Sequence, residues 1–148
     1  MKNNKFFLAV IAGTVVSFLL GWLIYGVLLK STMAANCGLP KEIAEKVFKP
    51  MDKPEAMPMI IIFISDIAGA LLLTIIAGWA NARTLSSGAM VGAIVGLLIS
   101  LNMDLLWYAM SNLYTPTEIA IDAGAALVVT AITTAVIATI LGKGKTAS

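Results

Sequence analysis

The chain has 148 residues, of which 59% are hydrophobic and only 12% are charged, and its formal net charge at pH 7 is +2. Roughly a quarter of the residues in an ordinary soluble domain are charged, so this composition argues against a soluble globular protein. The chain has no histidine and one cysteine, which excludes an internal disulfide and removes the commonest general base and metal ligand.

Four long apolar stretches predict transmembrane helices. They cover residues 6–29, 59–80, 89–110 and 119–141. Each reaches the roughly 20 residues that an α-helix needs to cross a bilayer. The sequence therefore predicts an all-α integral membrane protein, a four-helix bundle that forms a single transmembrane domain over residues 1–148.

The first connector, residues 30–58, is much longer than the other two and contains four prolines. Within it, residues 41–48 predict a short amphipathic helix, because Ile43, Val47 and Phe48 would share one apolar face. A helix of this kind lies in the headgroup region of the bilayer. We therefore expect a short interfacial helix between the first and second spans.

The remaining connectors, residues 81–88 and 111–118, are short, which predicts that the second, third and fourth spans pack as antiparallel neighbours. Four spans place both termini on one side of the membrane. Lysine and arginine are equally numerous on the two sides, five against five. We expect cytoplasmic termini, because the basic residues on that side lie close to the helix ends, where they determine orientation.

Small residues recur at every fourth position of all four spans. In the third span Gly88, Gly92 and Gly96 form two overlapping GxxxG units that continue into Ser100 and Asp104. Helices in lipid associate through close backbone approach and interhelical hydrogen bonds, and small residues favour both. The pattern predicts packing within the bundle or, at the third span, a contact between copies of the chain. The residues expected at helix contacts are Gly13, Gly21, Gly78, Gly88, Gly92, Gly96 and Ala126.

Three aspartates lie on the same stripes, one in each of the last three spans. At 1.5 Å per residue, Asp66 and Asp104 lie roughly 10 Å inside their helix ends and Asp122 about 5 Å inside. Antiparallel packing would bring all three to one leaflet, with Asn102 and Tyr108 at a similar height. No lysine or arginine lies deep in any span. At least one proton is expected to stay in this cluster near neutral pH, because low dielectric and like charges disfavour ionisation.

Three interpretations of the aspartate cluster stay open. Glu118 is expected near its outer end, close to the membrane surface. The carboxyl groups could bond neighbouring helices as structural contacts, hold a proton or cation, or line a pocket for a cationic or polar ligand. The corresponding functions are a small channel-like or transporter-like protein and, alternatively, an accessory or assembly subunit of a larger membrane complex. A homo-oligomer is expected for the transport function, because one four-helix chain is small for alternating access.

No catalytic constellation, zinc spacing, P-loop, dinucleotide fingerprint or nucleic-acid-binding motif is visible in the sequence. The sequence therefore predicts no enzyme, no metal site and no cofactor. Its expected partners are the lipid bilayer and other membrane-embedded chains, without nucleic acid.

Several segments resemble a known family. They are the end of the first span, GWLIYG at residues 21–26, the run DLLWYAMSN at residues 104–112 and the GKGK tail at residues 142–145. The third span adds Gly88, Gly92 and Gly96, which we call the glycine ladder. Together they are similar to a group of uncharacterised small bacterial membrane proteins that carry a domain of unknown function. The resemblance implies a four-helix protein of the bacterial inner membrane and implies no activity.

Overall fold

The computed structural model describes residues 3–40, 42–43 and 56–143, and its regular elements over these residues are all helical. In chain order they are α1 (Asn3–Gly21), the π-helical segment η1 (Trp22–Leu28), α2 (Lys30–Asn36), α4 (Ala56–Trp79), α5 (Leu85–Met110) and α6 (Pro116–Gly142). Four of the helical stretches are long and apolar enough to cross a membrane, with α1 and η1 forming one of them. The prediction of an all-α, four-helix membrane protein is confirmed.

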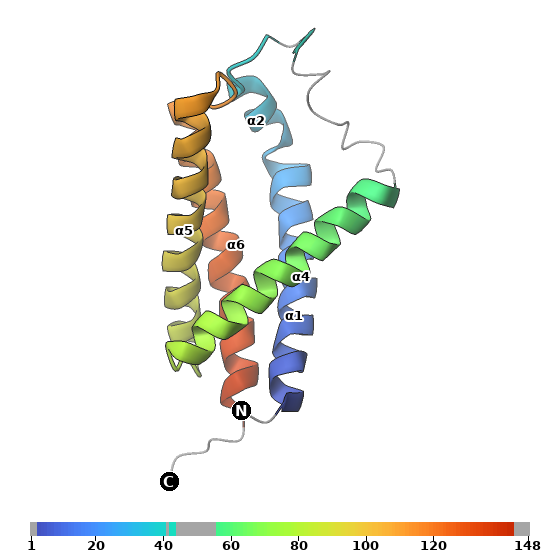
Figure 1. Cartoon of the computed structure of the whole chain (residues 1–148), viewed down its shortest axis with the longest axis vertical. Helices are drawn as coiled ribbons and strands as arrows, with labels where there is room; N and C mark the ends of the chain where they lie inside the picture. Colours follow the sequence, from blue (N-terminus) through green and yellow to red (C-terminus); the bar gives the residue numbers. More distant parts are fainter. Residues whose placement is uncertain (1–2, 41, 44–55, 144–148) are drawn as a thin grey trace.

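Three long helices stand side by side and the fourth crosses them (Figure 1). Helices α1, α5 and α6 are upright in this view, and α4 runs obliquely across them. Helix α6 makes its most extensive contact with α5 and also packs against α1 and α4. Helices α4 and α5 touch each other little. The expectation that the second span packs beside the third therefore differs from the structure, in which α4 lies on α1 and α6.

The turn between α4 and α5 is fixed by a cap on each side. Asn81 adopts the left-handed backbone conformation, with φ of 52°, and the backbone N–H of Ala82 donates to the carbonyl of Ala77 at 2.9 Å. These are the features of a Schellman motif that ends a helix. Thr84 then caps α5, because its hydroxyl accepts from the N–H of Ser87 at 3.2 Å while the Ser87 hydroxyl accepts from the N–H of Thr84 at 3.1 Å.

The interfacial helix expected at residues 41–48 lies almost entirely outside the described residues, of which only Glu42 and Ile43 belong to it, and both are helical. At the opposite end of the bundle, α1 begins where α6 ends. There the ammonium group of Lys5 donates to the backbone carbonyl of Lys143. The first and last described residues therefore lie at the same end of the bundle (Figure 1).

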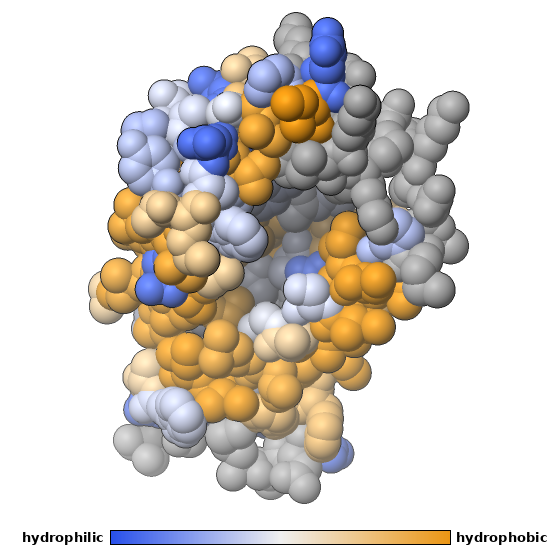
Figure 2. All heavy atoms as spheres, turned by 45° about the horizontal axis from the view of Figure 1, so that its top comes forward, coloured by the Kyte–Doolittle hydropathy of each residue, from blue (hydrophilic) through white to orange (hydrophobic). Residues whose placement is uncertain are grey.

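The interior of the bundle is built from small side chains. Fully buried positions include Ala9, Ala77, Ala138 and Thr74. Large apolar side chains such as Phe7, Ile61, Leu98 and Met110 are exposed instead. Hydrophobic residues accordingly cover much of the face drawn in Figure 2 and surround a hollow in it. This distribution suits a bundle whose outer surface contacts lipid and whose helices approach through small residues.

Candidate functional site

The candidate site lies at one end of the contact between α5 and α6. Only one face of α5 is buried, and it consists of residues spaced by four, which all lie on one side of a helix. The buried residues of α5 are Gly88, Gly92, Gly96, Ser100 and Asp104. This stripe places Ser100 and Asp104 against α6, directly beyond the three glycines.

The glycines set the distance between the two helices. A Cβ atom added at Gly92 would lie 2.6 Å from the hydroxyl oxygen of Thr134, and one at Gly96 would lie 2.7 Å from Cβ of Thr130. Both values are below the 3.0 Å that real Cβ atoms essentially never show. The glycine ladder is therefore occupied by α6 of the same chain, so a contact between copies would use a different face.

Two carboxyl groups meet where the glycine ladder ends. The hydroxyl oxygen of Ser100 lies 2.9 Å from Oδ2 of Asp104 on its own helix and 2.9 Å from Oδ2 of Asp122 on α6. Asp104 is only 3% exposed. We call Asp104 and Asp122 the carboxyl pair. Close packing of α5 on α6 is what allows one short hydroxyl side chain to reach both members.

One proton on the carboxyl pair would complete its hydrogen bonds to Ser100. A serine hydroxyl has a single hydrogen, and an ionised carboxylate can only accept hydrogen bonds. Ser100 can therefore donate fully to one member of the pair, and a protonated second member could donate to the serine oxygen. Both 2.9 Å contacts are two-centre hydrogen bonds when one carboxyl group is protonated.

A buried third acid lies near the carboxyl pair. Glu118 precedes Asp122 by one helical turn and therefore lies on the same face of α6. It is 6% exposed, and its Oε2 atom is buried with no hydrogen-bond partner in the described part of the chain. Its backbone N–H donates to the hydroxyl of Thr115, which caps α6, at 3.2 Å.

Two tyrosines complete the surroundings of the pair. Tyr25 lies beside Asp122 and comes from the π-helical segment η1, a kind of local widening that is frequent at functional sites. Tyr114 lies in the loop before α6, outside the spans. Burial raises the pKa of Tyr114 above its ordinary value of 10.0, and the nearby carboxyl groups of Asp104, Asp122 and Glu118 raise it further. Tyr114 thus connects the carboxyl pair to the loop.

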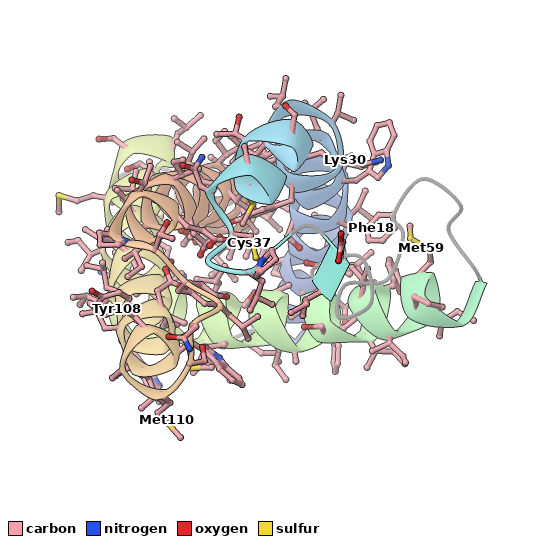
Figure 3. The ribbon with its side chains drawn as sticks, turned by 90° about the horizontal axis from the view of Figure 1, so that it is seen from above. Phe18, Lys30, Cys37, Met59, Tyr108 and Met110 are labelled. Carbon is pink, nitrogen blue, oxygen red and sulfur yellow. The ribbon has the colours of Figure 1, made fainter. Side chains whose placement is uncertain are left out.

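The structure separates the other predicted site residues from the pair. Asp66 lies beside Ser17 of α1, because α4 turns away from α5 as it crosses the bundle. Asn102 is exposed. Tyr108 is 48% exposed and points away from the middle of the bundle (Figure 3). The expected cluster of three aspartates is therefore a pair, and Tyr25, which the sequence did not single out as a site residue, lies closer to it than Asp66.

The residues expected at helix contacts differ in how closely they pack against a neighbouring helix. Gly13 of α1 packs closely on α6, where an added Cβ would lie 2.8 Å from Cδ1 of Ile137. A Cβ added at Gly21 would have nothing within 4 Å. Gly78 is half-buried near the end of α4, and Ala126 is half-buried and accepts a hydrogen bond from the hydroxyl of Thr130.

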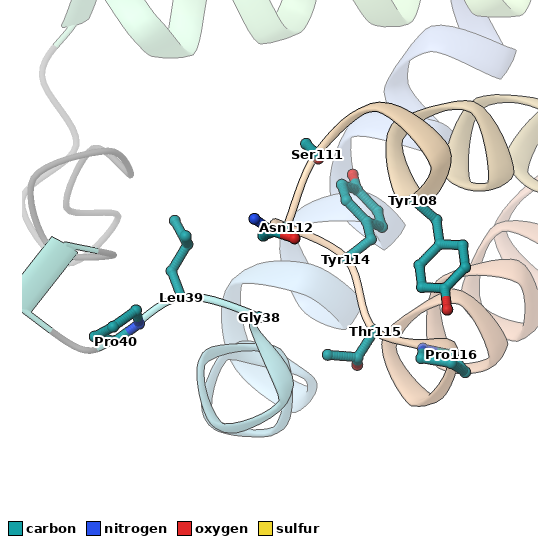
Figure 4. Close-up of a pocket in the computed structure, with 9 residues that line it drawn as sticks. All are labelled: Gly38, Leu39, Pro40, Tyr108, Ser111, Asn112, Tyr114, Thr115 and Pro116. Atoms are coloured by element: carbon teal, nitrogen blue, oxygen red, sulfur yellow. The ribbon is translucent and has the colours of Figure 1, made fainter.

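An open pocket of about 570 Å³ lies between the segment after α2 and the loop that joins α5 to α6 (Figure 4). Tyr108 and Tyr114 line one side and Gly38 lines the other. Two hydrogen bonds hold these segments together, from the N–H of Gly38 to the carbonyl of Leu113 at 3.1 Å and from the hydroxyl of Thr115 to the carbonyl of Asn36 at 2.9 Å. Tyr114 thus belongs to the pocket and to the surroundings of the carboxyl pair.

Within the described part of the chain, no three acidic or cysteine side chains lie close enough to bind one metal ion together. This includes the carboxyl pair and Glu118. The site can therefore offer a metal ion two carboxyl groups at most, together with neutral oxygens such as that of Ser100.

Comparison of the sequence with known proteins identifies the family of the chain but does not identify an activity. The sequence matches the family described as "Protein of unknown function (DUF1761)" over residues 8–139, a range that includes most of each long helix. No curated protein and no solved structure matches the chain. The resemblance noted in the sequence is confirmed. With its four apolar helices, the chain is a multi-pass membrane protein and belongs to the DUF1761 family.

Proposed function

We propose that the protein is a small channel-like or transporter-like membrane protein that binds a proton at the carboxyl pair. The observation that carries the proposal is the position of the Ser100 hydroxyl, 2.9 Å from both Asp104 and Asp122. Acidic residues within membrane-spanning helices are costly and mark ion or proton sites more often than other residues do. A pair of carboxyl groups that one proton completes, with Asp104 buried and Asp122 half-buried, can take up and release that proton.

A proton suits the pair better than a metal ion or a larger cation. Calcium ions take six to eight oxygen ligands, and magnesium ions demand six in near-ideal octahedral geometry. The pair offers few, and among the described residues no third acid completes the set. Asp104 is also nearly inaccessible, at 3% exposure, which leaves little space for an organic cation. A proton needs neither additional ligands nor space.

The surroundings of the carboxyl pair support the exchange of protons with the solution at one end of the bundle. Glu118 and Tyr114 lie on the side of the α5–α6 loop, and Tyr114 also lines the open pocket there. In the other direction α5 and α6 pack through Gly96 and Gly92 with no room even for a methyl group. In this conformation we therefore expect protons to reach the pair from the loop side.

Proton flux into liposomes tests the proposal. The full-length protein is reconstituted with an enclosed pH-sensitive dye, and a potassium gradient with valinomycin drives proton entry. Asp104→Asn and Asp122→Asn each replace an ionisable group by an amide of similar shape, so both should abolish the flux. Asp66→Asn is the matched control, because Asp66 lies in a span but apart from the pair, and it should retain the wild-type rate.

Two results would reject proton transport at this pair. One is wild-type flux in both Asp104→Asn and Asp122→Asn. The other is an inactive wild-type protein that is correctly folded and inserted, which would favour the alternative of an accessory or assembly subunit.

We further propose that the transport-competent form is a homo-oligomer, because a single chain with four long helices is small for alternating access. Its interface would use the exposed apolar faces, since the glycine ladder is already covered by α6. Native mass spectrometry of the complex extracted from membranes should give a multiple of the chain mass. A stoichiometric complex with a different chain would instead support the accessory-subunit function.

We also propose that the protein resides in the bacterial inner membrane with both termini in the cytoplasm. The described basic residues Lys5, Arg83 and Lys143 lie at the end where α1 begins and α6 ends, and such residues near helix ends favour the cytoplasmic side. A C-terminal fusion to green fluorescent protein should fluoresce, and a fusion to alkaline phosphatase should be inactive. The reverse pattern would invert the orientation.

A further inference from the structure

Three basic side chains from three separate segments gather at the end of the bundle opposite the α5–α6 loop. The ammonium group of Lys5 in α1 donates to the carbonyl of Lys143, which follows α6. Gly142 packs so closely on the backbone carbonyl of Arg83, in the α4–α5 turn, that an added Cβ would overlap it. We call Lys5, Arg83 and Lys143 the basic end.

No acidic side chain belongs to the segments that form the basic end. Residues 3–9, 79–91 and 134–143 contain neither aspartate nor glutamate. The positive charges of the basic end therefore lack a carboxylate partner within the segments that build it. A ligand with negative charge would complement them.

Arg83 is the only arginine in the chain. Its Nε atom is buried and has no hydrogen-bond partner among the residues that the structure describes. A buried donor that is left without an acceptor costs about 1–3 kcal/mol, and more when the group is charged. An oxygen acceptor that reached the guanidinium group would offset that cost.

The backbone at Arg83 is held rigidly on both sides. The Schellman motif around Asn81 ends at Ala82, directly before it, and the capping box of Thr84 and Ser87 begins directly after it. The N–H of Arg83 itself donates to the hydroxyl of Ser87 at 3.2 Å. The turn thus fixes the backbone from which the guanidinium group extends, which lowers the backbone entropy that binding would cost.

The chemistry of the acceptor follows from the side chains. A guanidinium group matches the oxygens of a phosphate through two parallel N–H donors, and lysines attract phosphate as point charges. The neighbouring side chains then distinguish a lipid phosphate from a free one. Trp79 is 83% exposed and Leu85 is 66% exposed, and they flank the turn that carries Arg83. Exposed tryptophan at a helix end favours the headgroup level of a bilayer.

We propose that the basic end binds the phosphate of an anionic phospholipid. Arg83 contributes two parallel N–H donors to the phosphate, Lys5 and Lys143 add positive charge, and the acyl chains lie against the exposed apolar side chains of α4 and α5. This site is separate from the carboxyl pair and does not depend on the proton function.

Lipid titration followed by native mass spectrometry tests the proposal on the full-length protein in detergent. Phosphatidylglycerol should bind wild type about tenfold more tightly than phosphatidylcholine, which corresponds to about 1.4 kcal/mol. Arg83→Gln should lose most of this preference. Arg83→Lys keeps the charge without the planar fork and should lie between the two. Lys30→Gln is the matched control, because Lys30 is an exposed lysine at the opposite end, and it should bind like wild type.

Three outcomes would overturn the proposal. They are equal binding of the two lipids by wild type, unchanged phosphatidylglycerol binding by Arg83→Gln, and displacement of phosphatidylglycerol by millimolar inorganic phosphate, which would indicate a site for free phosphate. If Arg83→Gln fails to fold, Lys143→Gln provides the second test. It should weaken phosphatidylglycerol binding severalfold, and wild-type binding by this variant would contradict the proposal.

Discussion

Replacing Gly92 by alanine tests the close contact between α5 and α6. The added Cβ would lie 2.7 Å from Cβ of Thr134, about 0.7 Å less than the 3.4 Å at which ordinary contact begins. A second neighbour is the backbone carbonyl of Thr130. A backbone atom cannot rotate aside, so the two helices must move apart.

The size of the effect follows from two opposing contributions. Overpacking of a tight contact costs about 1–3 kcal/mol, and the backbone neighbour places Gly92→Ala near the upper end. Alanine favours the helical conformation over glycine by about 1 kcal/mol, which offsets part of that cost. A net loss of about 2 kcal/mol should lower the Tm by about 4–8 °C for a chain of this length.

Thermal unfolding of the purified protein in detergent, followed by circular dichroism, measures this shift. Gly124→Ala is the matched control, because Gly124 also lies in a helix but an added Cβ there would have nothing within 4 Å. It should leave the Tm unchanged or raise it slightly. If Gly92→Ala were as stable as Gly124→Ala, the close packing of α5 on α6, and with it the reach of Ser100 to Asp122, would be refuted.

Three further predictions concern single side chains. Ser100→Ala removes the hydroxyl between the carboxyl groups of Asp104 and Asp122 and should reduce the unfolding free energy by about 1–3 kcal/mol. Unchanged thermal stability would contradict the shared hydrogen bonds. Thr84→Ala removes the cap of α5 and should cost about 1 kcal/mol, whereas Ser86→Ala, at an exposed neighbouring position, should cost less in the same unfolding assay. Because burial raises the pKa of Tyr114 in the folded protein, its contribution to stability is complete below pH 10 and declines as the pH rises through the raised pKa. Tyr114→Phe should therefore lose less stability than wild type between pH 10 and pH 12, and parallel losses would show that Tyr114 does not titrate as described.

The class of the protein and the contact face of one helix could be predicted from the amino-acid sequence. Apolar runs of more than 20 residues have few alternatives to spanning a membrane, because only a helix or a closed barrel satisfies every backbone group in lipid. The spacing of Gly88, Gly92 and Gly96 also identified the buried face of α5, since residues four apart share one side of a helix. Both are local properties of the chain.

The pairing of the small-residue stripes depends on how the whole helices pack. The stripe of α5 pairs with that of α6 and brings Asp104 to Asp122, while α4 crosses obliquely and leaves Asp66 beside Ser17. Every stripe of small residues offers a similar surface, so spacing cannot specify the partner or the crossing direction.

The contacts of Tyr25 and Arg83 could not be predicted from the sequence either. Tyr25 reaches Asp122 from a π-helical segment, and Arg83 meets the residues at the end of α6 through a turn fixed by two caps. Each contact joins segments separated by many residues, and the packing of whole helices sets their distance. Periodicity along one helix carries no information about that distance. For this reason the helices and the buried face of α5 could be predicted from the sequence, whereas the sites could be recognised only in the folded structure.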